Sequence, residues 1–240
     1  MRRNFLNLVL CAVFFSSACG VSAEDKVVLK TKLPNPLLVG TPLSVNILNV
    51  PNLDSKITRK RSDFLIPVGA TNLAKSKKVT ASDSKPLVGT LALITDGDKE
   101  GDDGSWVELS PGKQWIQIDL EQNSTIYAIL VWHFHLRDRV YYNVVVQICN
   151  DQKFEKDVTT IFDNTVGSGK DLAYIENYQG KLIDAKGVKG RYVRLYSNGN
   201  TDNKMNHYIE VEVFGQPATT VGPDAPKVPL KTRLPNPLLQ

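Results

Sequence analysis

The histidines are the first side chains in this sequence whose type and spacing could do chemistry. His133 and His135 stand two residues apart, so on a β-strand both imidazoles would lie on one face. His207 is the third histidine of the chain. Imidazole nitrogens are common ligands of zinc, copper and iron. A transition-metal site, and with it a metal-dependent enzyme, is therefore one hypothesis for this chain.

Residue types suited to sugar recognition begin at the second histidine. A sugar ring needs an apolar surface for its C–H face and planar polar groups for its hydroxyls, which aromatic, His, Arg and Asn side chains supply. The residues that we predict to bind a ligand are His135, Arg137, Arg139, Tyr141, Asn203 and Asn206. The alternative is structural: Trp132 and Tyr142 belong to the core, and the arginines pair with nearby acids.

Acidic residues are concentrated between positions 96 and 103, where five of eight residues are Asp or Glu. Carboxylates this close repel one another unless water solvates them or a cation neutralises them. Ligands that are all oxygens favour calcium over zinc. The run therefore indicates either a calcium site or a solvated acidic turn.

Other kinds of catalytic or binding site find little support. Cys149 is the only cysteine outside the first 23 residues, so we expect a structural thiol and no internal disulfide. The chain contains no G-x-S-x-G, H-E-x-x-H or phosphate-loop motif. The net charge of +4 comes from 29 basic and 25 acidic residues without a basic helical run, which argues against a nucleic-acid partner.

Strands must position these side chains, because apolar residues alternate along much of the middle of the chain. Residues 115–120, 191–195 and 208–214 alternate, and 126–131 and 142–148 are rich in apolar residues. No helical pattern intervenes. We therefore predict an all-β fold, an antiparallel β-sandwich or jelly roll, over residues 64–216.

The first 23 residues have the layout of a signal peptide, with a basic start, an apolar stretch and small residues at the end. Cleavage after Ala23 fits an ordinary signal peptidase, whereas the residues around Cys19 are similar to a lipoprotein box that would give a lipid anchor. We predict an exported protein, periplasmic, at the cell surface or secreted. No apolar run reaches the roughly 18 residues that span a bilayer.

Extended arms flank the predicted sandwich. Residues 24–63 contain several prolines and no sustained period, which indicates a linker or arm. The sequence of residues 29–38 recurs at 230–239 within the C-terminal arm, 217–240, with Lys32 replaced by Arg233 as the only difference. The copies could dock on the domain, tether it, or present one partner-binding motif twice.

Five pieces of sequence, in a fixed order, carry a family resemblance. They are N-L-A and V-T-A-S within 72–82, L-I-T-D-G-D up to the tryptophan within 93–106, W-I-Q-I-D-L at 115–120, G-R-Y-V-R-L at 190–195 and I-E-V-E-V-F-G at 209–215. Together they resemble a discoidin domain, also called the coagulation factor five/eight type C domain, of the kind that bacteria export. The resemblance implies an eight-stranded jelly roll of the galactose-binding kind, with ligands on the loops at one end.

The resemblance also implies a function and a metal. Such domains are non-catalytic, so a carbohydrate or cell-surface glycan would be the partner. Many of them hold a structural calcium, whose ligands would here be Asp96, Asp98 and Glu210. Gly104 and Ser105 stand where the family has a threonine, which puts the full ligand set in doubt.

Two alternative functions remain open. The repeated Leu-Pro-Asn-Pro arms could make the chain a protein-interaction or scaffold module. The His-x-His pair is similar to the metal site of cupin jelly rolls, although Asp138 and Arg139 stand where a cupin has its glutamate.

Overall fold

The computed structural model of this chain describes residues 25–35, 45–54 and 61–218. Its strands are β1 (Lys26–Val28), β2 (Leu65–Pro67), β3 (Thr71–Asn72), β4 (Val79–Ala81), β5 (Val107–Leu109), β6 (Gln114–Trp132), β7 (Val145–Cys149), β8 (Thr159–Asp163), β9 (Lys181–Ser197), β10 (Asn206–Tyr208) and β11 (Glu210–Pro217). Helical structure in these residues is limited to one turn, α1 (Val45–Leu48), and a 3₁₀ segment, η1 (Leu91–Thr95). None of their helices is both long and apolar enough to cross a bilayer.

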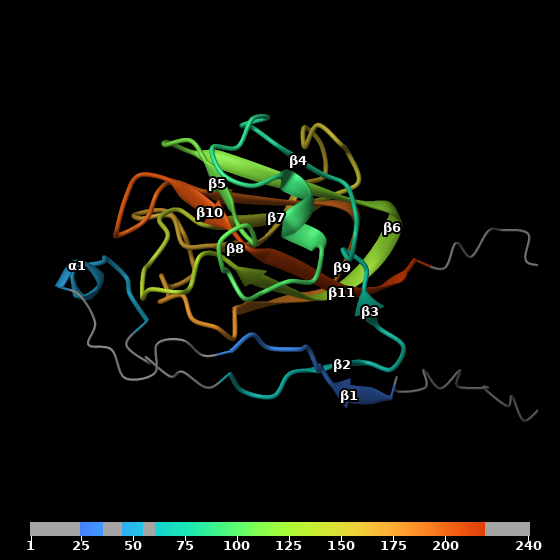
Figure 1. Ribbon diagram of the computed structural model, residues 1–240. Helices are drawn as coiled ribbons and strands as arrows, with labels where there is room; N and C mark the ends of the chain where they lie inside the picture. Colours follow the sequence, from blue (N-terminus) through green and yellow to red (C-terminus); the bar gives the residue numbers. More distant parts are fainter. Residues whose placement is uncertain (1–24, 36–44, 55–60, 219–240) are drawn as a thin grey trace, which may run out of the picture.

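The strands form an antiparallel β-sandwich, as the alternation in the sequence predicts (Figure 1). The main sheet has the order β3-β11-β6-β9-β7-β8, and β4 also pairs with β6. β6 and β9 pair along most of their length with a register shift between Asp119 and Ser124. β4 pairs with the first half of β6, and β11 pairs with the second half. A small second sheet joins β5 to β10.

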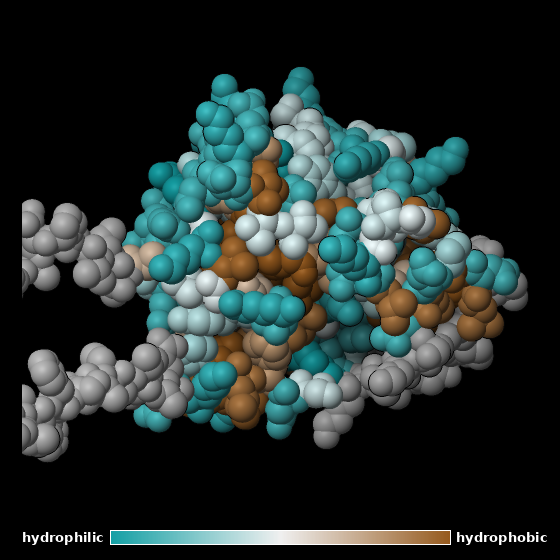
Figure 2. Space-filling model, turned by 180° about the vertical axis from the view of Figure 1, so that it is seen from behind, coloured by the Kyte–Doolittle hydropathy of each residue, from teal (hydrophilic) through white to brown (hydrophobic). Residues whose placement is uncertain are grey.

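The strand pair of β6 and β11 is apolar on both faces. Ile129 and Val131 belong to the main core cluster, whereas Leu130 and Trp132, which alternate with them, belong to a second cluster on the outer face. This double burial explains why residues 126–131 read as a continuous apolar run rather than as an alternation. Apolar residues also gather across the middle of the rear surface, between hydrophilic edges (Figure 2).

The described part of residues 24–63 packs on the sandwich. β1 pairs with β2, and Leu29, 6% exposed, lies in the outer cluster with Trp132. Ile47 of α1 is fully buried in a third cluster with Val140. This segment is therefore more than a linker along these residues. The predicted signal peptide, Cys19 and the C-terminal arm beyond residue 218 lie outside the described residues and stay predictions.

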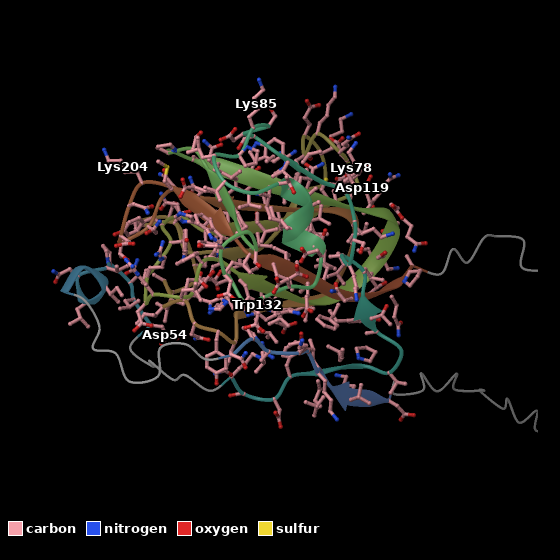
Figure 3. The ribbon with its side chains drawn as sticks, in the orientation of Figure 1. Asp54, Lys78, Lys85, Asp119, Trp132 and Lys204 are labelled. Carbon is pink, nitrogen blue, oxygen red and sulfur yellow. The ribbon has the colours of Figure 1, made fainter. Side chains whose placement is uncertain are left out.

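Trp132 anchors the outer cluster, and its ring leaves no space beside Gly180. The indole nitrogen donates a hydrogen bond to Tyr178 O at 2.9 Å. Gly180 has φ +69°, and a Cβ there would lie 2.6 Å from the Trp132 ring. Figure 3 shows Trp132 at the underside of the sandwich, and its bond to Tyr178 joins it to the loop before β9.

We predict that Gly180→Ala destabilises the fold more than Gly167→Ala. Both positions have positive φ, but a Cβ at Gly167 meets nothing within 4 Å. Backbone strain costs either variant about 1 kcal/mol, and overpacking against Trp132 costs Gly180→Ala roughly 1–3 kcal/mol more. Urea denaturation measures both. Equal losses would show that the ring yields without cost.

Candidate functional site

A pocket of about 280 Å³ opens among the loops that connect the strands at one end of the sandwich. It is lined by Gly112, Tyr142, Asn198, Gly199, Asn200, Asn203 and Lys204. The lining combines one aromatic side chain, three amides and an ammonium group. Tyr142 is half-buried, while Asn198, Asn203 and Lys204 are exposed, and Figure 3 shows Lys204 pointing outward from this end.

Backbone hydrogen bonds hold the two main walls of the pocket together. Tyr142 N donates to Gly199 O at 3.0 Å, and Asn198 N donates to Tyr142 O at 2.9 Å. Gly199 has φ +72°, and a Cβ there would lie 3.2 Å from Lys204 O, so the loop closes tightly around it. The Asn200 side chain accepts hydrogen bonds from Asp202 N and Asn203 N, which fixes the turn at the rim.

Asn206 fastens the pocket from below. Its carbonyl oxygen accepts hydrogen bonds from Gly199 N at 2.9 Å and from the Ser197 hydroxyl at 2.8 Å. Its amide nitrogen donates to Ser110 O and Gly112 O, both at 2.9 Å. The side chain is fully buried. It joins the loop after β5 to the loop between β9 and β10, and so it positions the lining instead of touching a ligand.

The structure places the six predicted ligand residues differently. Asn203 lines the pocket, and Arg137 is exposed. The other four, Tyr141, His135, Arg139 and Asn206, are 2%, 6%, 4% and 0% exposed. The expectation that these four form an open ligand surface is therefore corrected. Tyr141 turns inward because neighbouring residues of an extended segment face opposite ways, which leaves its neighbour Tyr142 on the pocket side.

Tyr141 belongs to a buried chain of hydrogen bonds. Its hydroxyl lies 2.7 Å from His207 Nδ1, and His207 Nε2 lies 3.0 Å from a carboxylate oxygen of Glu108. Burial is the main cause that lowers the pKa of His207 to about 3, so the ring is neutral. Because Glu108 can only accept, Nε2 carries the proton, and Nδ1 accepts from the Tyr141 hydroxyl. Burial raises the pKa of Tyr141 well above its usual range, which keeps that donor protonated.

The three histidines do not converge on one point. His133 Nδ1 lies 2.7 Å from a Glu176 oxygen, and His135 Nε2 donates to Lys99 O at 2.8 Å. No group of three His, Cys, Asp or Glu side chains within the ranges that the structure describes is arranged to hold a metal ion. The metalloenzyme hypothesis therefore gains no support from these residues. Cys149 is buried and forms no disulfide.

The acidic loop lies against the start of β11, where Glu210 is fully buried. One Glu210 oxygen accepts a hydrogen bond from Gly97 N at 3.1 Å, and the other has no hydrogen-bond partner. Burial raises the pKa of Glu210 to about 9; the charges of Glu212 and Asp96 add to this effect, while the hydrogen bond from Gly97 N and the charge of Lys99 oppose it. An unpartnered, buried carboxylate oxygen beside a second acid fits a cation.

Asp98 is hydrogen-bonded within the acidic loop. Its carboxylate accepts hydrogen bonds from Glu100 N at 3.0 Å and from the Ser105 hydroxyl at 2.8 Å. The hydrogen bond from Glu100 N is the largest cause that lowers the pKa of Asp98. These bonds close the loop on itself. Both Asp98 oxygens are engaged within it.

Sequence reasoning missed two features of this region. The structural alternative places Tyr142 in the core, and its ring does pack partly against the third cluster, but it also lines the pocket, which no signal in the sequence shows. Lys99 stands within the acidic run, where the sequence suggests an exposed side chain. In the structure it is 6% exposed, and its ammonium lies 2.8 Å from Glu212 Oε1. Only the fold shows that this lysine and Glu212 form a buried pair.

We predict that Asn206→Ala destabilises the fold by roughly 2–4 kcal/mol, because it leaves several buried backbone groups without partners. Asn198→Ala is the matched control: its side chain is exposed, so we expect a change within about 0.5 kcal/mol. Chemical denaturation gives both values. A loss of under about 1 kcal/mol for Asn206→Ala would contradict its role as the fastening of the pocket.

Solved structures similar to this chain include a glycoside hydrolase, a fucose binding module and a fucolectin. A family 89 glycoside hydrolase from Clostridium perfringens, in complex with 2-acetamido-1,2-dideoxynojirmycin, has a TM-score of 0.48 and 19% identity over 61% of this chain, which spans only 15% of that chain. A fucose binding module of Streptococcus pneumoniae has a TM-score of 0.43 and 24% identity, covering 60% of this chain and 96% of that one. A fucolectin from striped bass serum has a TM-score of 0.46 and 21% identity, covering 61% and 49%.

No curated protein matches the sequence of this chain. The family model of the F5/8 type C domain, however, matches residues 78–211, which is more than half of the chain. This match covers the strands from β4 to β10 and the start of β11, and it includes both the pocket and the acidic loop. The resemblance in the sequence is thereby confirmed: the chain belongs to the F5/8 type C, or discoidin, domain family.

Proposed function

We propose that this protein binds a carbohydrate, without transforming it, in the pocket between Tyr142 and the loop that joins β9 to β10. The observation that carries the proposal is the lining itself: one aromatic ring faces a row of amides in a concave site on loops that Asn206 fastens. The ring offers an apolar surface to the C–H face of a sugar, and the exposed amides of Asn198 and Asn203 offer polar groups to its hydroxyls, whereas the Asn200 amide is already bonded within the loop.

The size of the pocket limits what it holds. A volume of about 280 Å³ is at the lower end for small-molecule sites, so the pocket suits one sugar unit, at a chain end or as a branch. Lys204 at the rim can donate to a hydroxyl or pair with a carboxylate of the glycan. The glycan would be met outside the cytoplasm, since residues 1–23 have the layout of a signal peptide.

We predict that Tyr142→Ala and Lys204→Ala each weaken glycan binding, Tyr142→Ala by roughly tenfold or more, which corresponds to about 1.4 kcal/mol. A glycan array with diverse polysaccharides identifies the ligand, and calorimetry then compares the variants. Lys85→Ala is the control for Lys204→Ala, since both lysines are exposed and Figure 3 places them apart.

Two outcomes would count against the sugar proposal. An array that stays blank with folded protein would remove its basis. If neither pocket variant changes the affinity, the ligand binds to another surface of the sandwich.

We also propose a structural calcium between Glu210 and Asp96, with backbone carbonyls of the acidic loop as further ligands. The support is the unpartnered buried oxygen of Glu210 and the position of Asp96, which directly precedes Gly97, whose N–H bonds to Glu210. When bound, the ion would neutralise both carboxylates and fasten the loop to β11. Asp98 would act indirectly, because its oxygens are already engaged in closing the loop.

We predict that calcium stabilises the protein and that Glu210→Gln removes this effect. An ion at about 100 times its Kd adds about 2.7 kcal/mol, which thermal unfolding with calcium or a chelator detects. In the chelator, stability of the wild type should fall as pH rises from about 4.3, the ordinary pKa of glutamate, towards about 9, because the folded state keeps a proton on Glu210 that the unfolded state loses. Glu210→Gln should remove that pH dependence.

The control for the calcium test is Asp103→Asn, which changes an exposed carboxylate of the same loop. We expect it to keep the response to calcium. Identical calcium responses in wild type and Glu210→Gln would contradict the proposed site.

A further inference from the structure

The first copy of the repeated sequence covers the outer face of β6 and β11. Leu29 is buried there in a cluster with Ile66, Leu130 and Trp132. Two residues on, the Thr31 hydroxyl donates a hydrogen bond of 2.7 Å to Glu212 Oε2. We call the surface that the arm covers, formed by the residues of the outer cluster other than Leu29 together with Glu212 and Glu100, the arm face.

The rest of the copy extends along the same face. Asn35 N donates to Glu100 Oε2 at 3.0 Å, a bond that uses only the backbone of the arm. Pro34 is buried, whereas Lys30, Lys32 and Leu33 are exposed. The arm therefore docks through Leu29, Thr31 and Pro34 and through its backbone. Figure 1 shows this dark blue segment running beneath the sandwich.

The repeat extends three residues further towards the N-terminus than residues 29–38. Residues 26–38 and 227–239 are identical at eleven of thirteen positions, and the two differences are Val28 with Pro229 and Lys32 with Arg233. Leu29, Thr31 and Pro34 correspond to Leu230, Thr232 and Pro235. Every side chain that buries itself on the arm face is therefore kept in the second copy.

The two differences fall where docking does not depend on the residue. Lys32 is exposed. Hydrogen bonds are the larger causes that lower the pKa of Asp98, and the positive charge of Lys32 adds to them. An arginine at this position keeps that charge. Pro229, which corresponds to Val28, has no backbone N–H, so docking tolerates it only if Val28 N makes no bond to β2. Val68 N donates to Asp25 O, and Leu29 N donates to Phe64 O. Bonds to the partner strand alternate along an antiparallel pair, so Val28 N points away from β2.

The second copy can reach this face within one molecule. The Gln216 side chain, at the end of β11, donates to Val68 O at 2.8 Å, and Val68 N bonds to Asp25 O at 2.9 Å. The chain thus leaves β11 beside the start of the docked arm. Eight residues, 219–226, separate Ala218 from Lys227. Fully extended they span roughly 26–29 Å, and a short tether keeps the effective concentration high.

We propose that residues 227–239 are an alternative occupant of the arm face, so that the two copies of the repeat compete intramolecularly for one docking surface. The second copy keeps the residues that make these contacts in the first, so the two docked arrangements would differ little in free energy. The competition is independent of the sugar pocket, because the hydrogen bonds of the docked arm involve no residue that lines the pocket.

Four forms of the full chain test the proposal: wild type, Leu29→Asp, Leu230→Asp and the double variant. An aspartate cannot be buried in the outer cluster, so each substitution disables one copy. We expect each single variant to lose roughly 2 °C or less in unfolding temperature, because the other copy fills the face, and the double variant to lose roughly 5–10 °C. Hydrogen exchange should become slower over residues 229–239 in Leu29→Asp.

The control is Leu33→Asp, a leucine of the same copy that is 37% exposed against 6% for Leu29, and we expect it to behave as wild type. If Leu230→Asp adds no loss in the Leu29→Asp background, and exchange over 229–239 is unchanged, the proposal is overturned. If Leu29→Asp self-associates in sedimentation experiments and the double variant does not, the second copy binds a neighbouring molecule, which overturns the intramolecular exchange.

Discussion

The burial of β6 and β11 on both faces is the constraint on which the rest of the structure depends. Ile129 and Val131 fill the space inside the sandwich, so Leu130 and Trp132 must be covered from outside. The chain supplies that cover from its N-terminal arm and from the segment that leads to β3. The arm, for which the sequence leaves docking and tethering both open, is thus needed to cover the hydrophobic core from outside.

Covering this face also buries charge, and the charges connect the arm to the acidic loop. Glu212 receives a hydrogen bond from Thr31 and pairs with Lys99, whose ammonium also lies 5.2 Å from the centre of the Trp132 ring. Glu210, two residues earlier on the same face, is left with an unpartnered oxygen. A carboxylate in an apolar setting must be neutralised by a cation or by a proton. Lys99 neutralises Glu212, and the calcium ion proposed above would neutralise Glu210.

The sequence predicts the fold well and the ligand site only in part, and both results have one cause. Alternation identifies strands such as 115–120 and 208–214, because one face of each must be apolar. It does not tell which of two polar or aromatic neighbours faces a ligand. Tyr141 and Tyr142 are adjacent and identical in type, yet the first bonds to His207 inside the core and the second lines the pocket. Asn206 and Lys99 act through partners about 100 residues away in the sequence, which no local pattern reveals.

The central claim is that the loops fastened by Asn206 bind a sugar, and titration followed by amide chemical shifts tests it most directly. A monosaccharide identified by glycan screening is added to isotopically labelled protein, and every backbone amide is observed at once. The account predicts saturable shifts concentrated at Gly112, Tyr142 and residues 198–204, with the arm face unaffected. Shifts that cluster on another surface, or none at saturating sugar, would contradict it.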